Sequence, residues 1–106
     1  MSYSKEYILN AIREKLQSID PGAQAILFGS RARGDNKSDS DWDVLILLDK
    51  QQLATDDFDK ISYPLIELGW GLNEMISPKL YTVNDWLKRS FTLFYKNIEK
   101  EGVVLL

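Results

Sequence analysis

The chain has 106 residues with no cysteine and no histidine, and its formal net charge is -3 at pH 7. These features exclude disulfides, zinc–thiolate sites, histidine metal sites and histidine-dependent triads, and they leave carboxylates, hydroxyls, lysine and arginine for any chemistry. The acidic balance argues against a nonspecific grip on nucleic acid, and no apolar run reaches membrane-spanning length. We therefore expect residues 1–106 to form one domain that is cytoplasmic and has neither a membrane nor nucleic acid as partner.

The first third of the chain predicts a helix, a strand and a glycine turn. Apolar residues at helical spacing predict a helix from Ser4 to Ile19, which Asp20-Pro21-Gly22 ends. The apolar run from Ala23 to Phe28 predicts the first strand. Gly29 then permits a tight turn and the close approach of a ligand to the backbone. The following residues, Ser30 to Gly34, predict one short helical turn whose free N–H groups could face a phosphate.

Two aspartates mark the start of the second predicted strand, Trp42 to Asp49, which is apolar on both faces and therefore typical of the middle of a covered sheet. Asp41 and Asp43 are two residues apart, so the period of a strand puts both carboxylates on one face, roughly 6 to 7 Å apart along the chain. A divalent cation would remove their repulsion. Such hard oxygen ligands suit Mg²⁺, which completes its shell with water and substrate phosphates. The sequence thus predicts a magnesium site beside a phosphate-binding turn.

The middle of the chain predicts a second helix from Thr55 to Leu68, with Thr55 as its cap. Pro64 should kink this helix or split it after Ser62. Gly69-Trp70-Gly71 reads as a break. A third strand is expected from Leu72 to Tyr81, where Pro78 suits an edge or a bulge better than a central position.

The last quarter predicts helix again. Thr82-Val83-Asn84-Asp85 resembles a capping box and opens a helical stretch, although one helix and two helices that meet near Ser90 are both compatible with it. Gly102 ends this stretch, and Val103 to Leu106 form either a short closing strand or a segment that docks elsewhere. The resulting order of helices and strands predicts an α+β fold, a mixed sheet with flanking helices.

The central motif resembles a known family. Gly29-Ser30, ten residues and then Asp41-x-Asp43 ahead of an apolar strand resemble the signature of the DNA polymerase beta-like nucleotidyltransferase superfamily. The fuller string, Gly-Ser-Arg-Ala-Arg-Gly with Ser-Asp-Ser-Asp-Trp-Asp, is similar to the minimal nucleotidyltransferases, small proteins that are usually encoded beside a HEPN-domain partner. The resemblance covers almost the whole chain. It implies the palm-like nucleotidyltransferase fold of DNA polymerase beta.

The resemblance also implies roles for individual residues. Gly29 and Ser30 would hold the triphosphate of ATP, and Asp41 and Asp43 would bind Mg²⁺ and carry catalysis. Larger relatives have a third carboxylate on a neighbouring strand, for which Glu74 is the candidate as catalytic residue and metal ligand. The implied activity is transfer of AMP from ATP to a protein hydroxyl, as in an antitoxin that adenylylates its HEPN toxin. The alternative is a binding module that neutralises the partner by complex formation alone.

Other polar and aromatic residues leave two interpretations open. Arg31 and Arg33 either contact nucleotide phosphates or pair with Asp39 and Asp35 on the surface. Most aromatic residues of the second half are expected in the core. Their number in the C-terminal segment also favours an interface for a second chain, either a copy of this one or a different protein.

Overall fold

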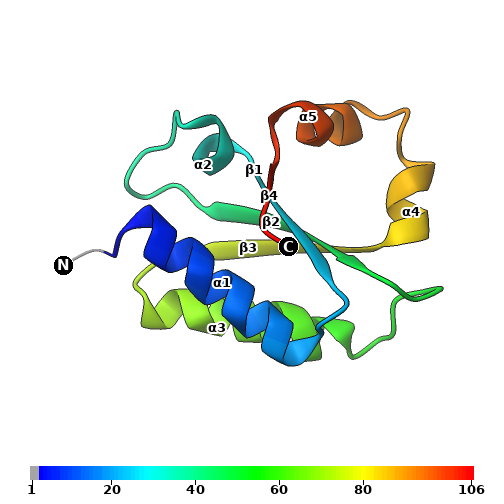
Figure 1. The fold of residues 1–106 in the computed structure, drawn as a ribbon, viewed down its shortest axis with the longest axis horizontal. Coiled ribbons are helices and arrows are strands. Elements are labelled where there is room, and N and C mark those ends of the chain that lie inside the picture. Colours follow the sequence, from blue (N-terminus) through cyan, green and yellow to red (C-terminus); the bar gives the residue numbers. More distant parts are fainter. Residues whose placement is uncertain (1–2) are drawn as a thin grey trace.

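The computed structural model describes residues 3–106 and has a four-stranded mixed sheet at its centre (Figure 1). The strand order is β3-β2-β1-β4, where β1 is Gln24–Phe28, β2 is Trp42–Leu48, β3 is Ile76–Thr82 and β4 is Val103–Val104. β1 is antiparallel to β2 and to β4, whereas β2 and β3 are parallel. The expected α+β class with a mixed sheet is confirmed, and β2 is a central strand as its two apolar faces predicted.

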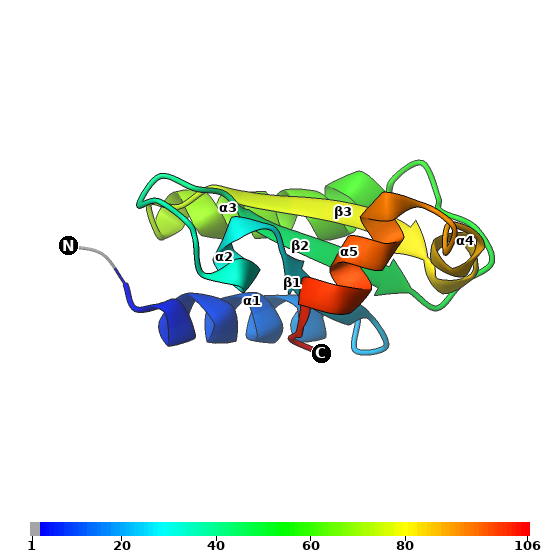
Figure 2. The ribbon, with the colours of Figure 1, turned by 90° about the horizontal axis from the view of Figure 1, so that it is seen from above.

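Helices cover both faces of the sheet. α1 (Lys5–Ile19) and α3 (Tyr63–Gly71) lie on one face, and α4 (Val83–Lys88) and α5 (Leu93–Glu101) lie on the other (Figure 1). From above, α1 and α3 run side by side beneath the strands (Figure 2). No helix among residues 3–106 is long and apolar enough to cross a membrane.

β2 divides the core into two parts because its side chains alternate between the faces. Trp42, Val44, Ile46 and Leu48 are buried against α1 and α3. Leu45 and Leu47 are buried on the opposite side with aromatic and aliphatic residues of α4 and α5. Asp43 is two residues before Leu45, so its side chain lies on the same face of the sheet, the one that α4 and α5 cover.

The expected cap at Thr82 is confirmed, and Ser4 also caps a helix. The Ser4 hydroxyl accepts a hydrogen bond from the Tyr7 amide (3.1 Å) at the start of α1, and the Thr82 hydroxyl accepts one from the Asp85 amide (3.1 Å) at the start of α4. The C-terminal stretch consists of two helices, α4 and α5. β4 then closes the chain by pairing with β1, which answers both questions that the sequence left open.

The region around Pro64 differs in part from the prediction. A π-helical turn, Phe58–Ser62, runs directly into α3, so the helix changes type after Ser62 but does not break there, since Ser62 and Tyr63 both keep helical φ and ψ. The helix does not begin at Thr55, because the Asp57 carboxylate accepts hydrogen bonds from the Ala54 amide (2.6 Å) and the Lys50 ammonium (2.8 Å), which fixes the preceding residues as a turn.

The expected break at Gly69-Trp70-Gly71 is wrong, since α3 continues through Gly71. Gly69 is tolerated in the helix because it allows a close approach of the chain: a Cβ at this position would lie 2.7 Å from the carbonyl oxygen of Glu74. The chain then turns at Asn73, which has a φ of 58°. β3 therefore begins at Ile76 rather than Leu72, and Pro78 stands on an edge strand as expected.

Candidate functional site

The turn after β1 is in contact with the start of β2. Phe28, the last residue of β1, is the register partner of Asp43. Gly29 has φ 73° and ψ -158°, a backbone conformation that essentially only glycine adopts. A Cβ on Gly29 would overlap the carboxylate of Asp43, so this glycine is required by the close approach as well as by its φ. The glycine turn and the aspartate therefore form one site.

A short helix continues the turn. α2 (Ser30–Arg33) begins immediately after Gly29, whose carbonyl oxygen accepts hydrogen bonds from the amides of Ala32 and Arg33 (3.1 Å each). The amides of the first helical residues have no carbonyl within the helix to bond. The predicted helical turn is thus confirmed, and it presents hydrogen-bond donors next to Asp43.

Asp41 and Asp43 bring two carboxylates together at the beginning of β2. Asp43 is half-buried and Asp41 is exposed. Burial raises the pKa of Asp43, the charge of Asp41 raises it further, and Lys79 and Arg33 partly oppose the shift. Two carboxylates that repel each other across a face of a strand fit a divalent cation.

The number of carboxylates defines the kind of metal site. Within the described part of the chain, residues 3–106, no group of three Asp, Glu, His or Cys residues could hold a metal ion. A pair of oxygen ligands fits Mg²⁺, because this ion is commonly bound through one or two carboxylates together with substrate phosphates. The donor set of Asp41 and Asp43 therefore fits a magnesium ion that arrives with a nucleotide.

Arg31 is turned away from this site and holds the loop that leads into β2. Its guanidinium donates to the carbonyl oxygens of Ser40 (3.0 Å) and Ser38 (3.2 Å) and stacks over Trp42. The Arg31 side chain is only 11% exposed, and it lies 3.8 Å from the carboxylate of Glu74. The expected surface pairing of Arg31 with an aspartate is wrong, because its ionic partner is Glu74.

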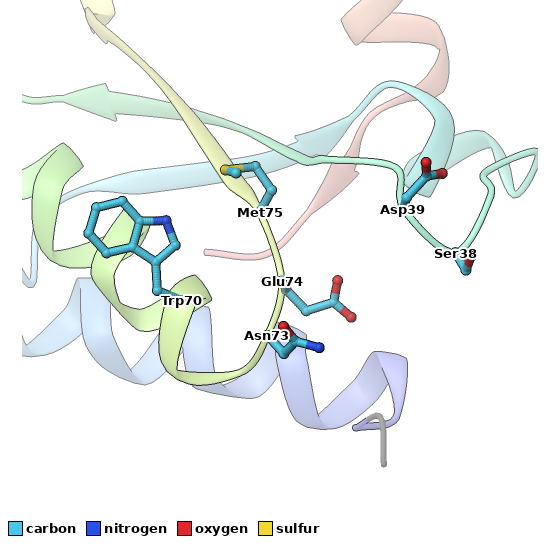
Figure 3. Close-up of a pocket in the computed structure, with 6 residues that line it drawn as sticks. All are labelled: Ser38, Asp39, Trp70, Asn73, Glu74 and Met75. Carbon is cyan, nitrogen blue, oxygen red and sulfur yellow. The ribbon is translucent and has the colours of Figure 1, made fainter.

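Glu74 is the site residue that the structure separates from the aspartates. Its carboxylate accepts a hydrogen bond from the Trp42 indole (3.2 Å), on the face of the sheet that α1 and α3 cover. It points toward the loop of Ser38 and Asp39, whereas Met75 points the other way (Figure 3). Because β3 begins only at Ile76, Glu74 belongs to the preceding turn, and the expected group of three carboxylates is not brought together.

Arg33 is exposed on the last turn of α2, close to the glycine turn. It forms ion pairs with Asp35 (3.2 Å) and Glu101 (3.3 Å), and the hydrogen bond that it donates to Asp35 is the main cause that raises the pKa of Arg33. The predicted surface pair with Asp35 is therefore present. Arg33 also lines a cavity of about 350 Å³ between the glycine turn and α5, together with Phe28, Gly29, Phe94, Asn97, Ile98 and Glu101.

Several residues around the aspartates could not be found from the sequence. Phe94 and Asn97 reach the site only because α5 crosses above β1, and nothing in the local pattern marks them. Ser77 and Lys79 face the site from β3: Ser77 is the register partner of Asp43, and Lys79 is that of Leu45. The alternation of β3 would have pointed to them, but only with its register to β2 known.

Comparisons with known proteins identify the family and the fold of the chain. The family model described as nucleotidyltransferase domain matches residues 9–105. No curated protein matches the chain. Among solved structures, the chain is similar to one in a toxin-antitoxin crystal structure with AMP-PNP, at 22% identity and a TM-score of 0.63, over 92% of this chain and 72% of that one.

Two chains in mutant structures of the toxin-antitoxin MntA-HpeT are also similar. Their identities are 19% and 18% and their TM-scores are 0.58 and 0.56. The matches cover 99% and 98% of this chain and 73% of each of those chains. At such identities the likeness shows a shared fold.

Proposed function

The chain belongs to the nucleotidyltransferase domain family, and from this membership and the site we propose a Mg²⁺-dependent enzyme that transfers AMP from ATP to a protein hydroxyl. The observation that carries the proposal is the contact between the Asp43 carboxylate and the Gly29 turn, with Asp41 two residues away. This arrangement brings phosphate-binding donors and metal-binding acceptors to the same point, as nucleotidyl transfer requires.

Each element of the site has a defined part in this proposal. The backbone at Gly29 and the hydroxyl of Ser30 bind the triphosphate, and Asp41 and Asp43 hold Mg²⁺. The ion neutralises charge on the α-phosphate and on the leaving pyrophosphate when it is bound. Arg33 contacts phosphate oxygens after exchange of its exposed ion pairs, which are weak in water.

The cavity beside Arg33 offers room for the rest of the nucleotide. Phe28 and Phe94 pack edge to face there, with ring centroids 5.5 Å apart, and Asn97 supplies an amide. An aromatic surface with one amide suits a nucleobase, which stacks on one and bonds the other. We propose that the sugar and base of ATP extend from Gly29 toward α5.

The acceptor in this proposal is a folded protein. The described residues form a single sheet with its helices, so a second substrate must bring its own binding surface. The similar structures are toxin-antitoxin structures, which favours an antitoxin role with a toxin as partner. The resemblance of the motif to minimal nucleotidyltransferases favours a HEPN-domain toxin and a tyrosine hydroxyl.

The test is to combine the purified protein, ATP, Mg²⁺ and the product of the neighbouring gene and to measure the intact mass of that product. We expect it to gain one or more AMP units, and to gain none when Asp41 and Asp43 are both replaced by Asn. Asp49→Asn, just after the far end of β2, is the matched control and should leave transfer unchanged. A partner that is bound and inhibited without any mass change would exclude the enzymatic proposal.

One observation favours a second candidate function, neutralisation of the partner by binding alone. On β3, the strand beside Asp43, the side chain in register is that of Ser77 rather than a third carboxylate. A site with two carboxylates can bind Mg²⁺ and ATP and yet transfer slowly. In that case the double aspartate variant should protect against the toxin as well as the unchanged protein does.

A further inference from the structure

The exposed edge strand presents one positive charge to the face of the sheet that carries the aspartates. β3 is parallel to β2, and its register pairs Ser77 with Asp43 and Lys79 with Leu45. Residues two apart in a strand share a face, so Lys79 lies on the same side as Asp43. From the spacings of a sheet, their Cα atoms are about 8 Å apart, within reach of a lysine side chain. Lys79 is exposed and free to meet a ligand.

The charges around Asp43 agree with this placement. Lys79 on β3 and Arg33 on α2 both lower the pKa of Asp43, against the effects of burial and of Asp41. Arg33 approaches from the side of β1 and is engaged by Asp35 and Glu101. Lys79 is thus the cation on the opposite side of β2.

The order of the strands indicates the side from which the acceptor attacks the nucleotide. Gly29 and Ser30 follow β1 on one side of β2, and β3 lies on the other side. If the pyrophosphate leaves on the side of Gly29 and Ser30, in-line displacement places the attacking oxygen on the opposite side of the α-phosphate. That side lies over β3, where Ser77 and Lys79 are.

We infer that the acceptor hydroxyl reaches the α-phosphate across β3 and that Lys79 is a catalytic residue that contacts the attacking oxygen. The inference rests on the proposed function and adds the side of the sheet from which the acceptor protein approaches the nucleotide. In the step, the acceptor oxygen forms a bond to the α-phosphorus of ATP, and the bond between that phosphorus and the oxygen of the pyrophosphate breaks. The hydroxyl proton passes to water. The Lys79 ammonium stabilises the negative charge on the oxygen as the proton leaves.

The chemistry favours a phenol as acceptor. A tyrosine hydroxyl has a pKa of about 10, far below that of an aliphatic hydroxyl, so a nearby cation can promote its ionisation without a strong base. No carboxylate stands in register beside Asp43 on β3 to act as that base. A tyrosine acceptor and Lys79 together compensate for the absence of such a base.

The experiment compares Lys79→Met with Lys79→Arg in single-turnover transfer of AMP from ATP to the partner protein, at increasing partner concentration. We expect Lys79→Met to lower the maximal rate about 100-fold, the typical effect of removing one group that stabilises developing negative charge. Lys79→Arg should recover a large part of the rate. The affinity for Mg²⁺-ATP, measured by calorimetry, should change less than about twofold in both variants, since the contact is to the acceptor.

Lys15→Met is the matched control, because Lys15 is an exposed lysine of α1 on the other side of the sheet. It should leave the rate and the affinity unchanged, and melting temperatures should confirm that all three variants fold. An unchanged rate in Lys79→Met would overturn the inference, and so would a loss of ATP affinity equal to the loss of rate. If the unchanged protein binds ATP but transfers no AMP, the proposed function fails, and the role of Lys79 fails with it.

Discussion

The guanidinium carbon of Arg31 lies 4.4 Å from the centroid of the Trp42 ring. The same guanidinium holds the carbonyl oxygens of Ser38 and Ser40 and lies 3.8 Å from Glu74. One side chain therefore connects α2, the loop before β2 and the turn before β3. These contacts position the backbone of the loop that carries Asp41 to the start of β2.

Arg31→Gln should reduce both stability and the affinity for Mg²⁺-ATP, although Arg31 does not face the site. The change leaves the carboxylate of Glu74, which is only 15% exposed, without its cation, and it frees two carbonyl oxygens. The expected loss is about 1–3 kcal/mol in the free energy of unfolding, measured by urea denaturation.

Glu74→Gln distinguishes a structural role of Glu74, as the partner of Arg31 and Trp42, from a role as metal ligand. The amide oxygen that the substitution introduces could still accept a hydrogen bond from the Trp42 indole, so transfer should be largely retained and stability should fall by less than about 2 kcal/mol. A loss of transfer as complete as that in Asp43→Asn would instead make Glu74 a metal ligand.

Gly29→Ala should abolish nucleotide binding and cost more than about 2 kcal/mol in the free energy of unfolding. The new methyl group meets the Asp43 carboxylate, and the backbone conformation at Gly29 is unfavourable for alanine. The control is Gly34→Ala, at a φ of 87° with no atom within 4 Å of the new Cβ. It should cost only about 1 kcal/mol and retain binding. Equal losses in the two variants would show that the contact with Asp43 has no effect.

Asp43→Asn should stabilise the metal-free protein near neutral pH while it abolishes transfer. Burial and Asp41 raise the pKa of Asp43 in the folded state, so the unchanged protein loses stability as pH rises from the ordinary aspartate value through the raised one. The gain in the variant should be at most about 1 kcal/mol at pH 7, because the group is partly exposed and solvent screens it. It should vanish below about pH 4, where both states of the unchanged protein are protonated.

Urea denaturation between pH 3 and pH 8 in the presence of a chelator measures this difference. Asp49→Asn removes a carboxylate just after the far end of β2 and should show no such gain. A variant that is less stable than the unchanged protein at pH 7 would contradict the electrostatic account of the pair.

Ser77→Asp should create the group of three carboxylates that the chain lacks in this region. The register puts residue 77 beside Asp43 on the same face, so the affinity for Mg²⁺ without nucleotide should rise at least about 10-fold, as measured by calorimetry. Without metal the variant should be less stable, because a third negative charge joins two others. Ser77→Asn, of similar size and without charge, should change neither quantity, and equal metal affinity in both variants would contradict the register.

The sequence predicted those parts of the site that depend on local periodicity. Asp41 and Asp43 follow from the period of one strand, and Gly29 and Ser30 follow from the turn that precedes it. The partners of Arg31 could not be predicted, because Trp42 and Glu74 come from distant segments that α3 and β3 bring together.

Glu74 shows how a small error in a boundary changes the function assigned to a residue. A strand from Leu72 was expected, but the contact of Gly69 with the Glu74 backbone and the positive φ of Asn73 delay it until Ile76. This backbone geometry depends on how α3 packs, and no pattern in the sequence reports it. The change removes Glu74 from the strand and makes Ser77 and Lys79 the neighbours of the site.

The alternation of β2 restricts where this chain can gain or lose residues during evolution. A single deletion between Val44 and Leu48, with the end of the strand held in register, would move Asp43 to the face of α1 and turn Trp42 toward α4 and α5, so it would disturb the core and the site at once. The segment between Gly34 and Lys37 is different, because it precedes the carbonyl groups that Arg31 holds and lies largely at the surface. Insertions there should cost little stability. We therefore expect related proteins to differ in length in this loop while they keep the site.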